Sequence, residues 1–295
     1  MEKIGLVLEG GGLRGAYTAG ALAWLNDHDI TFDYGVGISS GAVYLACYAM
    51  KNKQAAHDMA VAYACEPENV GMKALLKEGH YVAYNRIFEV DLKQKSNFTI
   101  QPILEEKPNI EIGVYVLEHG GTEFYGPEDM DEDCVLLLGA CALPIASDII
   151  EWKDYHVLDG GITKMIPIER AQEVGCTKFL VITTKPNDYV RKPASGFMKS
   201  AMKTVYRKYP QVGKDYAIRH LNYYKQIEIV KGLVEDGNAV HIMPTQSIKV
   251  SRFKGDPKNC QALYDLGYND MEERKEEILS LLENAKKEES ETVTA

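Results

Sequence analysis

The fold is decided by residues 4–41, where IGLVLEGGGLRG (Ile4–Gly15) and GISSG (Gly37–Gly41) each join an apolar run to a helical pattern. Ile4–Leu8 is short, apolar and followed by glycines, which is typical of a buried parallel strand. Phe32–Val36 is a second run of this kind. Small and apolar residues then recur at helical spacing over Gly15–His28 and Ala42–Met50. The sequence therefore predicts two successive strand–turn–helix units.

Further apolar runs predict that the sheet continues beyond these two units. Strands are expected at Ile110–Leu117, Thr122–Tyr125, Tyr155–Leu158, Lys178–Thr183 and Ala239–Met243, with short helices at Val135–Ala142 and Ile168–Val174. Strands that alternate with helices favour a three-layer α/β fold, in which helices flank both faces of a mostly parallel sheet.

We expect a single domain over residues 1–295, with a core at about residues 3–185 and 239–245. A basic helical excursion is expected at about 186–235, and a charged C-terminal helix and tail at about 268–295. Residues 185–225 hold ten Lys or Arg and two acidic residues, so this segment carries +8 and the remainder of the −10 chain carries −18. Two interpretations stay open: a solvated helical excursion, or a surface that contacts anionic membrane lipids.

The composition is that of a globular protein, with 45% hydrophobic and 26% charged residues. The net charge of −10 argues against nucleic acid as a partner. The six cysteines form no C-x-x-C pair, and no calcium loop is present, so we expect reduced thiols, no metal and no cofactor. No signal peptide or membrane-spanning run is apparent, which predicts a cytoplasmic protein that is able to touch a membrane. The oligomeric state is left open.

The first glycine turn, Gly10-Gly11-Gly12-Leu13-Arg14-Gly15, matches G-x-G-x-x-G after a strand and before a helix. Such a turn brings backbone N–H groups close to an anion, which can be a pyrophosphate or a transient oxyanion. A dinucleotide site also needs a carboxylate at the end of the second strand, and that strand runs instead into Gly37-Ile38-Ser39. The Gly-Lys-Ser/Thr of a nucleoside-triphosphate loop is absent as well.

The second turn, Gly37-Ile38-Ser39-Ser40-Gly41, fits the G-x-S-x-G nucleophile elbow in its strand–turn–helix setting. The motif predicts Ser39 as a nucleophile, with the backbone N–H of Ser40 beside its Oγ. None of the seven histidines has a catalytic local setting; His156 alternates with apolar residues as a strand residue does. Asp159, in Asp159-Gly160-Gly161 at a strand end, is the better candidate base, because a desolvated carboxylate that is hydrogen-bonded to a serine can deprotonate it.

Together and in this order, the three motifs resemble the patatin-like phospholipase family, and Tyr17, Ala19-Gly20, Leu22 and Pro167-Ile168 agree with it. The resemblance covers about residues 3–185, and the remainder is similar to a bacterial cytoplasmic branch. It implies a Ser39–Asp159 dyad that cleaves lipid or other acyl esters through an acyl-enzyme, without a metal. It also implies an oxyanion hole from the amides of Gly10, Gly11, Gly12 and Ser40, with the charge of Arg14 nearby. Supporting turn residues are Gly15, Gly37, Gly41, Gly160 and Gly161.

The sequence departs from the family pattern at two places. Met165 stands where the family often has Asn, and Gly139, Ala140 and Cys141 precede Pro144 where small hydroxyl residues are common. Neither change removes a proposed catalytic atom, but both bear on the shape of the acyl pocket. The alternative function is a catalytically silent regulatory or nucleotide-binding protein that uses the Gly10–Gly15 loop.

Overall fold

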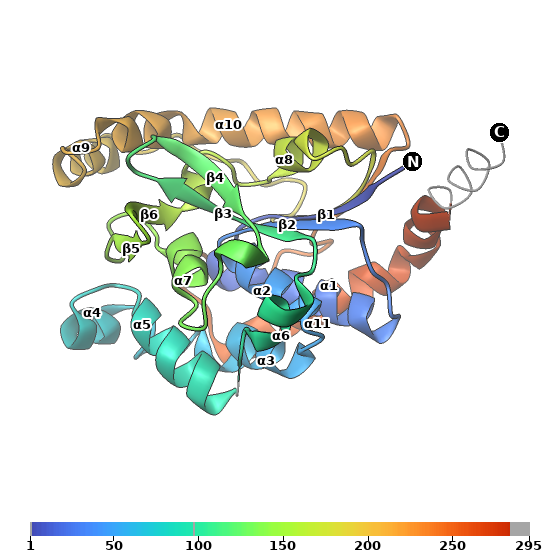
Figure 1. Ribbon diagram of the computed structural model, residues 1–295, viewed down its shortest axis with the longest axis horizontal. Helices are drawn as coiled ribbons and strands as arrows, with labels where there is room; N and C mark the ends of the chain where they lie inside the picture. The colour runs from blue at the N-terminus through green and yellow to red at the C-terminus, as the bar shows by residue number, and fades with distance from the viewer. Residues whose placement is uncertain (1, 97, 284–295) are drawn as a thin grey trace.

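The computed structural model describes residues 2–96 and 98–283, and in this part of the chain eight strands form one mixed sheet (Figure 1). The strands are β1 (Ile4–Leu8), β2 (Tyr34–Ile38), β3 (Ile110–Val116), β4 (Gly121–Tyr125), β5 (Ile150–Trp152), β6 (Tyr155–Asp159), β7 (Lys178–Ile182) and β8 (Ala239–Ile242). Parallel pairs join β3, β2, β1, β7 and β8 in this order. Antiparallel pairs join β3 to β4 and β6, and β6 to β5.

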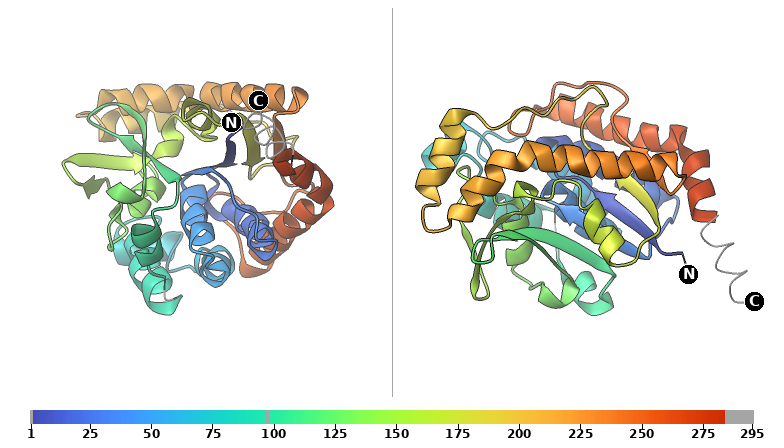
Figure 2. Two further views of the ribbon diagram at one scale, coloured as in Figure 1. Left: turned by 45° about the vertical axis from the view of Figure 1, so that its right-hand side comes forward. Right: turned by 90° about the horizontal axis from the view of Figure 1, so that it is seen from above.

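Helices cover both faces of the sheet, which confirms the three-layer α/β prediction. The α-helices are α1 (Ala16–Asp27), α2 (Ser40–Ala49), α3 (Lys53–His57), α4 (Met72–Glu78), α5 (Tyr84–Arg86), α6 (Gln101–Glu106), α7 (Val135–Cys141), α8 (Ile168–Glu173), α9 (Gly196–Val205), α10 (Pro210–Glu235) and α11 (Pro257–Glu273). Short 3₁₀ turns are η1 (Gly12–Gly15), η4 (Pro127–Asp129) and η5 (Gly160–Ile162), and π-helical turns are η2 (Asp58–Tyr63) and η3 (Ile87–Lys95). Helices α8 and α10 lie on one face, and α1, α2 and α11 on the other (Figures 1 and 2).

The second strand begins two residues later than the sequence predicts, at Tyr34 instead of Phe32. Asp33 ends the preceding loop, because its carboxylate accepts the N–H of Ile4 at 2.7 Å and its own N–H donates to the Ile4 carbonyl at 3.1 Å. The strand therefore extends to Ile38, and Ser39 follows it directly.

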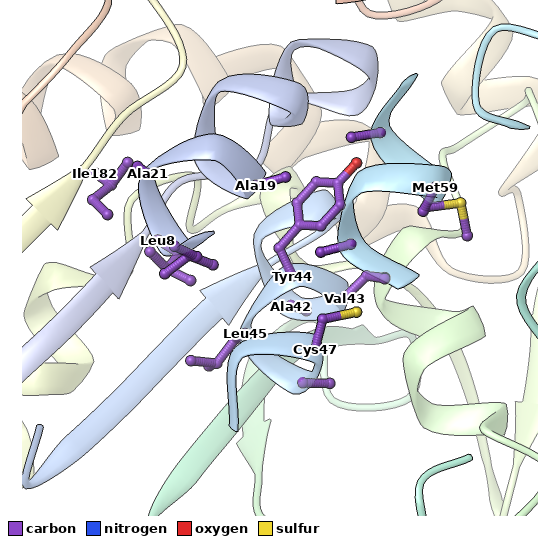
Figure 3. Close-up of a cluster of buried hydrophobic side chains, with 14 of the residues drawn as sticks. Leu8, Ala19, Ala21, Ala42, Val43, Tyr44, Leu45, Cys47, Met59 and Ile182 are labelled. Atoms are coloured by element: carbon purple, nitrogen blue, oxygen red, sulfur yellow. The ribbon is translucent and has the colours of Figure 1, made fainter. Parts of the chain in front are cut away.

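The core on the α1 face is built from small residues that let helices approach the sheet and one another. Ala19 of α1 and Ala42 and Leu45 of α2 pack near Leu8 and Ile182 of the sheet (Figure 3). Burial of these apolar groups is the main stabilising contribution to the layer.

Helix α11 belongs to this core and is not a peripheral tail. A Cβ on Gly20 of α1 would lie 1.9 Å from the carbonyl oxygen of Tyr264 in α11, so the two backbones are in direct contact. The buried hydroxyl of Tyr17 donates to Asp270 Oδ2 at 2.8 Å. The expected C-terminal helix thus begins at Pro257 instead of near residue 268 and is helical again over 275–283. The expected polar tail, 288–295, lies outside the described residues.

The expected basic excursion forms α9 and the 26-residue α10. Helix α10 runs along the α8 face of the sheet (Figure 2) and buries Val212, Tyr223, Gln226 and Val230 there. Within residues 2–96 and 98–283, no helix combines the length and apolarity needed to cross a membrane.

Candidate active site

Strand β3 brings the serine elbow and the aspartate turn to the same place. Its residue Gly113 pairs with Ile38 at the end of β2, and the next residue, Val114, pairs with Asp159 at the end of β6. Because β4 pairs with Ile112–Val116 along the opposite edge, β2 and β6 share one edge of β3 and end toward each other. Ser39 and the Asp159 turn therefore leave the sheet side by side, although they are far apart in the sequence.

The Ser39 elbow has the strained backbone that the motif predicts. Ser39 has φ 56° and ψ −127°, a conformation that L-residues rarely adopt and that costs on the order of 1–3 kcal/mol. Gly37 and Gly41 permit the sharp turn, since a Cβ on Gly37 would lie 2.6 Å from the Gly41 carbonyl oxygen. Ser39 is 7% exposed, and its side chain makes no hydrogen bond to another described residue.

The glycine loop lies against this elbow, and a Cβ on Gly10 would lie 2.9 Å from Ser39 Cβ. Two of the four expected oxyanion donors already have acceptors. The N–H of Gly10 donates to the Met165 carbonyl at 3.2 Å, and that of Gly11 donates to Ser40 Oγ at 3.0 Å. The N–H groups of Gly12 and Ser40, at the starts of η1 and α2, have no acceptor among the described residues. These two donors are free for a ligand.

Asp159 is buried, with 2% of its surface exposed, and caps η5 by accepting the Gly161 N–H at 2.7 Å. No hydrogen bond joins it to Ser39 Oγ in this structure. Burial raises the pKa of Tyr84, and the ionised forms of Cys141 and Asp159 would act in the same direction. Burial likewise raises the pKa of the Cys141 thiol, with Asp159 adding to the effect. Asp159 is therefore close enough to influence Tyr84 and Cys141, which belong to one cavity wall.

That wall belongs to an apolar cavity of about 80 Å³, which Gly12, Ser39 and Ser40 line at one end. We call it the acyl cavity, after the role that we propose for it below. Its other lining residues are mostly apolar: Leu13, Val43, Tyr44, Met59, Ala64, Val70, Val82, Tyr84, Ile87, Phe88, Cys141, Leu143, Arg252 and Phe253. Seven of these residues come from 51–101, where the sequence shows no motif.

The residues that were predicted to support the site differ in their surroundings. Gly15 packs against Ser40, and a Cβ on Gly160 would lie 2.6 Å from the Gly113 carbonyl oxygen. Arg14 is half-buried, with its guanidinium 5.9 Å from the centre of the Tyr189 ring, and forms no ion pair within the described residues. None of the seven histidines lines the acyl cavity. His156 contacts Glu118, with Nδ1 2.6 Å from Oε1.

A buried ion pair between Glu9 and Lys185, which sequence reasoning missed, holds the start of the glycine loop. Glu9 precedes Gly10, contacts Lys185 Nζ and accepts the Thr184 N–H at 2.7 Å. Burial lowers the pKa of Lys185 to about 7, although the Glu9 carboxylate acts in the opposite direction. Burial by itself would raise the pKa of Glu9. The Lys185 ammonium outweighs this effect and holds the pKa of Glu9 below its ordinary value. The pair fixes the base of the loop to the end of β7.

Gln226 is a second residue that sequence reasoning missed. Its buried side-chain oxygen accepts the N–H groups of Met165 and Ile166, each at 3.1 Å. Because Met165 in turn accepts the Gly10 N–H, Gln226 of α10 connects the segment after Asp159 to the glycine loop. Among the described residues, no group of His, Cys, Asp and Glu is arranged to hold a metal ion.

Comparison with known proteins agrees with this geometry. The family model of the patatin-like phospholipases matches residues 6–171, and a domain of unknown function (DUF6363) matches residues 209–283. The chain belongs to the patatin-like phospholipase family.

Two more distant similarities accompany the family match. The uncharacterized protein YjjU of Escherichia coli (strain K12) is 22% identical over 194 residues, which is 65% of this chain and 54% of the length of that relative. The crystal structure of VipD from Legionella pneumophila has a TM-score of 0.44 at 12% identity, over 92% of this chain and 66% of that one.

Proposed function

We propose that this protein hydrolyses carboxylic esters of lipids through an acyl-enzyme on Ser39. Membership of the patatin-like phospholipase family supports a lipid acyl hydrolase. The observation that carries the proposal is the position of Ser39, on a strained elbow that lines the acyl cavity and shares an edge of β3 with Asp159.

In the proposed reaction, Asp159 accepts the proton of Ser39 Oγ as the oxygen attacks the ester carbonyl. The proton then passes to the leaving alcohol, and Asp159 activates the water that releases the fatty acid. The hydrogen bond between Ser39 and Asp159 forms in the substrate complex, since catalytic contacts are often looser without substrate.

The N–H groups of Gly12 and Ser40 are the donors that we assign to the oxyanion, because they line the cavity with Ser39 and are free. Such donors contribute about 3 kcal/mol each to the transition state. Gly11 becomes a third donor only if its bond to Ser40 Oγ opens. The acyl chain occupies the apolar cavity, whose lining excludes water from the reacting atoms.

Two other functions compete with this one: a catalytically silent regulator and a nucleotide-binding protein. The close packing of Gly10 on Ser39 favours an oxyanion over a pyrophosphate at the loop. Labelling with a fluorophosphonate probe separates the three. We expect the wild type and Ser200→Ala, on the exposed face of α9, to be labelled and Ser39→Ala to remain unlabelled. An unlabelled wild type would contradict the hydrolase, and calorimetric binding of NAD or ATP would favour the nucleotide site.

We also propose that residues 185–225 contact anionic membranes. Helix α9 exposes 82% of Phe197 and 57% of Val205 beside exposed Lys199 and Lys203, which is the composition of an interfacial helix. All six cysteines are free thiols, which fits the proposed cytoplasmic location.

A further inference from the structure

A second cavity, of about 370 Å³, lies beside the glycine loop and is lined by positively charged side chains. Arg191, Arg219 and Arg252 line it, and we call it the arginine pocket. Lys192 adds a fourth charge, and none of the described residues that line it is acidic. In a chain with a net charge of −10, such a cluster stands out from the surrounding surface.

The three guanidinium groups are held in place but are not neutralised. Arg191 lies over the Tyr223 ring at 5.0 Å, Arg219 over Tyr216 at 5.6 Å and Arg252 over Phe253 at 6.0 Å, each measured to the ring centre. An aromatic ring attracts a guanidinium without taking up its N–H groups, which stay available to a ligand.

None of the three arginines forms an ion pair with a carboxylate in the described part of the chain, whereas Arg170 and Arg274 do. Burial lowers the pKa of Arg219, and the charges of Arg252 and Arg191 act in the same direction, whereas Tyr216 and Asp159 act against them. Burial also lowers the pKa of Arg14, which feels the charges of Arg252 and Arg191 as well. An anion in the pocket would relieve this repulsion.

The arginine pocket connects to both catalytic turns. Arg252 also lines the acyl cavity, and its carbonyl accepts the Leu13 N–H at 3.3 Å. A Cβ on Gly12 would lie 2.7 Å from that same carbonyl oxygen. Arg219 Nε donates to the Gly161 carbonyl in the Asp159 turn. The two cavities therefore meet at Arg252, and Ser39 lines the one that adjoins the arginine pocket.

We propose that the arginine pocket binds a phosphomonoester, so that the preferred substrates are acyl esters with a terminal phosphate, such as phosphatidic and lysophosphatidic acid. This inference rests on the proposed function and names its substrate class. A phosphomonoester carries about −1.5 to −2 charges at neutral pH and offers three acceptor oxygens to the guanidinium groups. A zwitterionic head group also brings an ammonium, for which the described lining of the pocket holds no carboxylate.

The test compares two soluble substrates with identical acyl chains, dihexanoyl phosphatidic acid and dihexanoyl phosphatidylcholine. We expect the wild type to favour the first by about tenfold or more in kcat/KM. Arg191→Gln and Arg252→Gln should reduce this ratio to within about threefold, mainly through KM. Arg207→Gln removes an exposed arginine of the same basic segment outside the pocket, and should keep the ratio. A wild type without the preference, or variants that retain it, would overturn the assignment.

A binding experiment separates failure of this inference from failure of the proposed function. Calorimetry with glycerol 3-phosphate on Ser39→Ala protein needs no hydrolysis, and we expect binding that Arg191→Gln weakens about tenfold. Binding without any ester hydrolysis by the wild type would overturn the hydrolase and the substrate assignment, and leave a site for a free phosphomonoester. Hydrolysis without head-group preference and without binding would overturn the arginine pocket alone.

Discussion

The acyl cavity and the arginine pocket lie against the same glycine loop and share Arg252, but they differ in almost every other respect. The acyl cavity is mostly apolar, and seven of its lining residues lie between residues 59 and 88, among them Met59 of the π-helical turn η2 and Ile87 and Phe88 of η3. The arginine pocket is cationic and is built from the 189–194 loop, α10 and the segment before α11. The contrast supports our proposal that the Ser39 elbow and the Asp159 turn act on a substrate with two parts, an acyl chain held by the apolar cavity and a charged head group held by the arginines.

The largest expected effect is the loss of activity on replacing Asp159, and it should be the same for substrates with either head group. Asp159→Asn removes the proposed base, so kcat should fall about 10³-fold for phosphatidic acid and phosphatidylcholine equally. Steady-state kinetics with the dihexanoyl pair measures both. His156→Gln, whose ring contacts Glu118 outside the cavities, should stay within about twofold of the wild type. An equally inactive histidine variant would show that the dyad is assigned wrongly.

A matched pair of substitutions separates the two cavities. Ala64 lines the acyl cavity and Ala194 the arginine pocket, and both are half-buried. Ala64→Phe should lower kcat/KM about tenfold for octanoyl relative to butanoyl 4-nitrophenyl esters, because the added ring takes the space of the chain. Ala194→Phe should leave this chain-length profile intact and lower the phosphatidic acid preference instead. If each variant changes both the chain-length dependence and the preference for phosphatidic acid, the two cavities do not act separately.

The smallest expected effect is on membrane binding, when a lysine that lies outside both cavities is replaced. Lys199→Gln on α9 should weaken binding to phosphatidylglycerol vesicles by about fivefold, since one lysine near an anionic surface contributes about 1 kcal/mol. Sedimentation with vesicles measures this, and Lys258→Gln on α11 is the control. The preference between soluble dihexanoyl substrates should not change. A change in that preference would place the head-group selectivity on the surface instead of in the arginine pocket.

Much of the fold and the local shape of the glycine loop and the Ser39 elbow could be predicted from the sequence, because both depend on short-range rules. Short apolar runs predicted β1 and β7 closely, and Ser39 has the strained conformation that its motif requires. The acyl cavity could not be predicted, since η2 and η3 have no regular hydrophobic period. The hydrogen bond from the Gly11 N–H to Ser40 Oγ could not be predicted either, because it depends on how two loops pack.

The sequence by itself determined the order and local shape of three turns: the glycine loop, the Ser39 elbow and the Asp159 turn. Their backbone conformations follow from the residues within them, since glycine and short polar side chains decide which φ and ψ values are accessible. Only the tertiary structure decided what surrounds these turns. The pairing of β3 with both β2 and β6 brings Ser39 and Asp159 to one edge, and the packing of α10 and α11 brings Arg219 and Arg252 beside them. Such contacts depend on burial over the whole chain, which no single motif contains.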